Sequence, residues 1–183
     1  MADRTTEEQI TYWRAFPRER PAKVETPGPG QESVWDYPRP PRLDPVSSRL
    51  RVEFAGVTVA ETARGMRVCE TAGAPVYYFP PEDVKRAFLR PMSHTTLCEW
   101  KGEASYWTLS VRGREAQAVA WCYPSPFQGF EAIAGWFAFH AGRADACYVG
   151  GERATPQPGG YYGGWITSNV VGPFKGKPGT ERW

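Results

Sequence analysis

Residues 98–123 have the sequence CEWKGEASYWTLSVRGREAQAVAWCY. Apolar side chains recur at every second position near the middle, namely Trp107, Leu109 and Val111. This period of two is typical of a strand with one buried face. An Arg-Gly-Arg triplet at 112–114 then reverses the chain, and the remaining residues pair back as a second strand. The stretch predicts one long strand over 98–111 and a β-hairpin.

The same alternation extends outward from this hairpin. Residues 49–54 alternate apolar and charged side chains, and further short strands are expected at 57–59, 66–70, 76–79, 136–140 and 144–149. Gly and Pro, 19 and 18 of the 183 residues, punctuate these strands and argue against long helices. Aromatic residues make up 14% of the chain and supply large side chains for a core built from short strands.

Two short helices are expected besides the strands. The first runs from Thr6 to Phe16, with Thr5 or Thr6 as its cap and Pro17 after its end. The second begins at Pro80-Pro81, turns Val84, Ala87 and Phe88 inward, and ends near Arg90. We predict an N-terminal arm over 1–32 and a single domain over 33–183. The fold class is mainly β: a compact antiparallel domain with packed arm and C-terminal tail.

The net charge and the hydropathy of the sequence argue against two kinds of partner, nucleic acids and membranes. The net charge is only +2, whereas proteins that bind nucleic acid usually carry a larger, clustered basic excess. No apolar run approaches the roughly 20 residues that span a bilayer, and residues 1–8 show no apolar signal core. We therefore expect a cytoplasmic protein without nucleic-acid or membrane partners. Its four separated cysteines should be thiols in that compartment.

Several ordered motifs resemble one known family. They are PVYYFPPEDV at 75–84, TTLCEWKGEASY at 95–106 and AWCYP at 120–124. These resemble the family catalogued as domain of unknown function (DUF) 427, over roughly residues 33–183, and the tail at 159–179 resembles its longer bacterial and fungal subgroup. The resemblance implies a fold similar to the β-tent of the Mss4-like group. The family also carries a nucleotidyltransferase label. The resemblance to this family implies no established catalytic residue.

Phosphate and metal motifs are not visible in the sequence. The segment Gly172–Lys177 comes close to the P-loop pattern G-x-x-x-x-G-K-[ST], but it is one residue too short. In addition, Pro178 follows it where the pattern needs Ser or Thr. Zinc relatives of the fold use close Cys pairs, which this chain lacks. His94 and Cys98 could supply two ligands, with Cys122, His140 or Cys147 completing a set. Isolated cysteines more often pack as small apolar groups, so we predict no metal and no cofactor.

Cys98 is a candidate nucleophile, because His94 and Lys101 stand near it in sequence and positive charge favours a thiolate. If residues 98–101 are extended, however, Cys98 and Lys101 point to opposite faces, and Cys98 is then a packed thiol.

The aromatic and polar residues of the paired strands predict a cleft for a small molecule. The expected ligand-binding residues are Tyr78, Glu99, Trp100, Lys101, Tyr106, Trp121 and Tyr123. Lys101 would neutralise a substrate anion and Tyr106 would donate a hydrogen bond, so Cys98, Lys101 and Tyr106 are the catalytic candidates. The alternative is a sheet face covered by the tail, with Lys101 paired to Glu99 or Glu103 at the surface. In that case the protein is a non-catalytic module that holds a partner or a second copy of itself.

Overall fold

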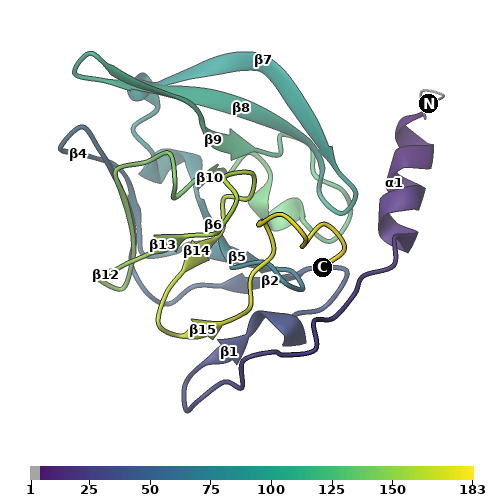
Figure 1. Ribbon diagram of the computed structural model, residues 1–183. Coiled ribbons are helices and arrows are strands. Elements are labelled where there is room, and N and C mark those ends of the chain that lie inside the picture. The colour runs from purple at the N-terminus through teal and green to yellow at the C-terminus, as the bar shows by residue number, and fades with distance from the viewer. Residues whose placement is uncertain (1–4) are drawn as a thin grey trace.

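The computed structural model describes residues 5–183, and the first four residues of the predicted arm lie outside the described residues. The chain is mainly β, as predicted, and a seven-stranded antiparallel sheet forms its centre (Figure 1). In spatial order the strands are β2 (Arg42–Pro45), β5 (Met66–Cys69), β6 (Val76–Phe79), β10 (Phe137–Phe139), β9 (Arg114–Cys122), β8 (Gly102–Val111) and β7 (Leu89–Cys98).

Smaller elements surround this sheet. A four-stranded sheet contains β12 (Glu152–Arg153), β11 (Ala146–Val149), β3 (Leu50–Phe54) and β4 (Val57–Thr62). Two short pairs join β1 (Glu32–Ser33) to β15 (Val170–Val171) and β13 (Thr155–Pro156) to β14 (Trp165–Ile166). The α-helix is α1 (Thr6–Ala15), and single 3-10 turns occur at Val34–Asp36, Pro81–Asp83, Arg86–Phe88 and Glu131–Ile133.

The predicted hairpin is confirmed at β8 and β9. Arg112 and Gly113 both have positive φ, at 50° and 77°, as a two-residue type I′ turn requires. Beyond the turn the pairing shifts register, and Ala118 of β9 has a φ of 49°. This β-bulge increases the local twist of the sheet.

Two predicted elements are wrong in their local form. The helix expected over residues 80–90 is instead a pair of 3-10 turns, because Val84 between them is extended and bridges to Ala60 of β4. The long strand expected over 98–111 begins only at Gly102, and residues 99–101 form a loop to the preceding strand. That strand, β7, lacks an apolar alternation because most of its side chains are exposed or half-buried.

Both faces of the central sheet are covered, and β6 shows how. Tyr77 and Phe79 point into the main core, where they meet the four-stranded sheet, while Tyr78 between them points to the opposite face. All three are buried, as a strand with two covered faces requires. In β8 the predicted alternation likewise places Leu109 in the main core and Tyr106 on the opposite face.

The arm and the tail pack onto this body. Of the two predicted caps of α1 it is Thr5 that caps the helix, and Thr5 forms a capping box with Glu8. The chain after α1 runs beside the C-terminus (Figure 1), where the Glu19 N–H donates to the Arg182 carbonyl. Trp165 of the tail is fully buried in the main core and donates its indole N–H to the Phe139 carbonyl. Within residues 5–183 the structure contains no helix of the length and apolarity that a bilayer crossing needs.

We expect the tail to contribute directly to stability. Trp165→Ala should lower the free energy of unfolding by about 3–5 kcal/mol, because it removes a fully buried ring. Tyr161→Ala, at a ring that is 75% exposed, should change it by less than about 0.5 kcal/mol. Urea denaturation measures both free energies, and a loss in Trp165→Ala as small as that expected for Tyr161→Ala would contradict the role of the tail in the core.

Candidate functional site

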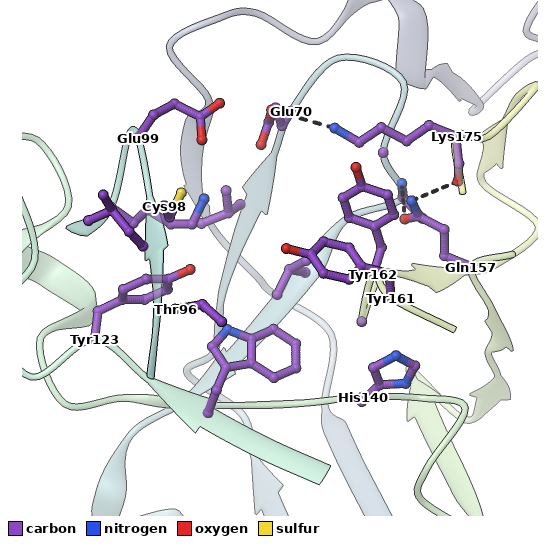
Figure 2. Close-up of a pocket in the computed structure, with 18 of the residues that line it drawn as sticks. Glu70, Thr96, Cys98, Glu99, Tyr123, His140, Gln157, Tyr161, Tyr162 and Lys175 are labelled. Atoms are coloured by element: carbon purple, nitrogen blue, oxygen red, sulfur yellow. Dashed lines mark hydrogen bonds and ion pairs between the residues drawn. The ribbon is translucent and has the colours of Figure 1, made fainter. Parts of the chain in front are cut away.

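A cavity of about 660 Å³ opens on the face of the central sheet opposite the main core. Most of its floor is sheet, with Tyr78 from β6, Tyr106 from β8 and Trp121 from β9. Tail residues Tyr161 and Tyr162 line the facing wall (Figure 2). Such a volume lies within the range of about 300–1,000 Å³ that is typical of small-molecule sites.

The loop between β7 and β8 turns Lys101 inward. Gly102 accepts a φ of 93°, which other residues rarely adopt, and this lets the chain close the hairpin tightly. Lys101 is only 7% exposed, and its ammonium lies 5.8 Å from the ring centre of Tyr123 and 5.7 Å from that of Phe130. No carboxylate of residues 5–183 forms an ion pair with it. Lys101 is therefore a buried cation that lines the cavity without a direct ion pair, and the Glu70 carboxylate acts on it from a longer distance.

A cluster of charges lies at the same end of the cavity. The Arg39 guanidinium bridges two carboxylates, at 2.9 Å from Glu70 Oε1 and 3.1 Å from Glu99 Oε1. The Lys175 ammonium is 3.5 Å from the same Glu70 oxygen (Figure 2), and Arg18 is 4.0 Å from the Glu99 oxygen. Three cations thus share two carboxylates, and Lys101 adds a further cation. The cluster carries more positive than negative charge.

The pKa values reflect this arrangement. Burial raises the pKa of Glu70, but the surrounding cations, Lys175 first, outweigh it and hold the pKa below its usual range. Burial lowers the pKa of the Lys175 ammonium, and the attraction of Glu70 only partly offsets this. For Lys101 burial is again unfavourable to the charge, but the sulfur of Cys98 and the Glu70 carboxylate together raise its pKa.

The Tyr78 hydroxyl lacks a hydrogen-bond partner. Tyr78 is fully buried and lines the cavity. The Trp121 indole lies beside it, yet within the described chain no group completes a hydrogen bond to the hydroxyl oxygen. An unsatisfied buried hydroxyl costs about 1–3 kcal/mol, so a ligand that pairs with it gains free energy.

His140 fastens the tail to the rim of the cavity. Its Nδ1 accepts from the Gly142 N–H at 3.1 Å, so the ring proton is on Nε2, which donates to the Gly160 carbonyl at 3.0 Å. Arg143 donates to the same carbonyl at 3.4 Å. Burial, and then the charge of Arg143, lower the pKa of His140, which favours this neutral form.

Most of the residues predicted for the cleft do come together. The cavity is lined by six of the seven expected ligand-binding residues and by the candidate nucleophile: Tyr78, Glu99, Lys101, Tyr106, Trp121, Tyr123 and Cys98. Trp100 does not line it; its ring lies between Arg14, 5.2 Å away, and Arg39, 5.5 Å away. The Tyr106 hydroxyl is 2.9 Å from the Thr96 hydroxyl.

Sequence reasoning missed the cavity and cluster residues that the chain before β2 and the tail contribute. The missed residues lie in stretches without strand periodicity, and they are Arg18, Arg39, Tyr162 and Lys175. Among them, only the lysine in the Gly-rich tail could have suggested a functional residue from the sequence. The alternative pairing of Lys101 with Glu99 or Glu103 at the surface is not seen, since Lys101 is buried.

The structure does not assemble the ligand set considered for zinc. Cys122 and Cys147 belong to the main core, whereas Cys98 packs on the opposite face of the sheet. Among residues 5–183, no three His, Cys, Asp or Glu side chains gather closely enough to hold a metal ion.

Comparison with known protein families gives a match over more than half of the chain. A family model described as a domain of unknown function (DUF427) matches residues 42–150. No curated protein matches the chain. Glu70, Glu99 and Lys101 lie inside the matched residues, whereas Arg18, Arg39 and Lys175 lie outside them.

The His140 contact predicts a pH dependence. Unfolded His140 takes up a proton near pH 6.5, but the folded ring resists protonation to lower pH, so acidification should destabilise the fold below about pH 6.5. His140→Gln keeps a donor for the Gly160 carbonyl and does not titrate. Urea unfolding at about pH 7.5 and about pH 5.5 should therefore show a smaller loss in this variant. An identical loss in both proteins would contradict the assignment.

Proposed function

The chain belongs to the DUF427 family, and from its site we propose that it binds a small anionic molecule with a planar, aromatic-like part. The observation that carries the proposal is the excess of buried positive charge at one end of a cavity with aromatic walls.

Buried charge that lacks a partner is costly, and the cost falls when an anion arrives. Lys101 and Lys175 are both buried and both line the cavity. Glu70 and Glu99 are already shared with Arg39, so they cannot neutralise every cation around them. A ligand carboxylate or phosphate would complete the charge balance.

The walls favour a flat partner for this anion. The half-buried aromatic residues Tyr106, Trp121 and Tyr162 line the cavity, and rings pack well against planar groups. The unpaired Tyr78 hydroxyl could donate to a ligand oxygen, a role that we predicted for Tyr106. Lys101 keeps its predicted role of neutralising the anion.

We also propose a β-tent fold, membership of the longer subgroup of the family and a cytoplasmic location. Several sheets around shared cores support a β-tent fold, and a packed tail beyond residue 150 supports the longer subgroup. The cytoplasmic location rests on the sequence alone.

A specific observation also supports the alternative, an interaction module. Helix α1 buries none of its side chains, and Tyr12 and Trp13 on it are 37% and 43% exposed. If these rings hold a second copy, light scattering should show a concentration-dependent mass that Tyr12→Ser lowers.

The charge excess predicts anion-selective binding. Phenyl phosphate and benzoate should raise the melting temperature, whereas phenol and benzamide should not. At a ligand concentration of 100 times the Kd, binding raises the free energy of unfolding by about 2.7 kcal/mol. Lys175→Met should abolish the shift, and Lys85→Met, at an exposed lysine, should retain it. Equal shifts from phenol and phenyl phosphate would contradict the proposal.

Tyr78 offers a second, independent test. Tyr78→Phe should stabilise the ligand-free protein by about 1 kcal/mol, because it removes an unsatisfied hydroxyl, yet weaken phenyl phosphate binding about tenfold. Tyr37 also has a buried, unpaired hydroxyl, but it lies outside the cavity. Tyr37→Phe should therefore leave binding unchanged. Denaturation and calorimetry give the two quantities, and unaltered binding in Tyr78→Phe would contradict the role of this hydroxyl.

A further inference from the structure

Cys98 differs from the other cysteines in its surroundings. Cys69, Cys122 and Cys147 are buried in apolar clusters, and burial raises the pKa of each thiol. Cys98 is partly exposed and is the cysteine among residues 5–183 that lines the cavity. Figure 2 shows its sulfur on the same side of the cavity as the Tyr123 hydroxyl.

The loop geometry removes the objection raised by the sequence. An extended chain over residues 98–101 would separate Cys98 from Lys101, but Cys98 ends β7 and residues 99–101 form the hairpin loop after it. The Cys98 sulfur is among the groups that raise the pKa of the Lys101 ammonium and of the Tyr123 hydroxyl. No carboxylate of the described chain forms an ion pair with Lys101, so negative charge that develops on the Cys98 sulfur during a reaction would lie near a buried cation.

We propose that Cys98 is the nucleophile of this cavity and accepts an acyl group from an ester or thioester that carries a second, anionic group. The inference rests on the proposed function, because the anion would be held by the cations at Lys175 and Arg18. It is carried by three features together: the cavity that the partly exposed Cys98 lines, the buried lysine Lys101 that lines it too, and the unpaired hydroxyl of Tyr78, a third lining residue.

The reaction balances without an oxidant or a metal. The Cys98 sulfur attacks the carbonyl carbon, a C–S bond forms, and the bond to the leaving group breaks. The leaving group departs with the electron pair and takes up the proton that the Cys98 thiol loses, passed on through the Tyr123 hydroxyl or water. Tyr78 would donate a hydrogen bond to the oxyanion. Water then hydrolyses the thioester, which releases the acid and restores the thiol.

The test uses the full chain with 4-nitrophenyl succinate, an anionic ester, and 4-nitrophenyl acetate, its neutral counterpart. We expect a burst of one nitrophenolate per chain and an acyl adduct on the Cys98 peptide by mass spectrometry. The anionic ester should react at least about tenfold faster than the neutral one. Cys98→Ser should lose the burst, Lys101→Met should slow it about tenfold, and Lys85→Met should leave it unchanged.

Alkylation of the unaltered protein tests the same proposal without a variant. Iodoacetate should alkylate Cys98 before the three buried cysteines, and saturating phenyl phosphate should protect it, so the result does not depend on the folding of a variant. If phenyl phosphate binds but neither ester nor iodoacetate modifies Cys98, the nucleophile is overturned while the proposed function stands. If Cys98 reacts but phenyl phosphate neither binds nor protects, the binding proposal fails instead. A Cys98 adduct that forms equally fast in Lys101→Met would also overturn the inference.

Discussion

Two carboxylates hold the arm, the sheet and the tail together at one place. Glu70 follows β5 and Glu99 lies in the β7–β8 loop, and Arg39, from the segment just before β2, bridges both. Lys175 from the tail and Arg18 from the arm complete the group. Charges removed from water are tolerated only when they are paired with good geometry, so this cluster constrains where both flanking segments can lie.

The central sheet makes that cluster part of a cavity rather than of a surface. Because each strand alternates its side chains, Tyr77 fills the main core while Tyr78 faces the cavity. The tail covers this second face only in part, leaving a space between Tyr78 and Tyr162. His140 fixes the tail there by a hydrogen bond to Gly160.

The flanking segments also set the sign of the charge. Within the residues matched by the family, the cluster has Glu70, Glu99 and a single buried cation, Lys101. Arg39 and Lys175, together with the arginine at position 18, come from outside that range and reverse the balance. The preference for an anion is therefore a property of the whole chain rather than of the matched domain alone.

The sequence by itself determined the mainly β class, the β8–β9 hairpin, the cap of α1 and most of the aromatic side chains of the cavity. These features are encoded within a few residues, by side-chain alternation and by turn and cap chemistry. Only the tertiary structure decided that Lys101 is buried beside Cys98, and that Glu70 meets Lys175 more than 100 positions later in the chain. The electrostatic potential at a residue is the sum of contributions from all charged neighbours in space. The local sequence pattern does not indicate which distant segments supply those charges.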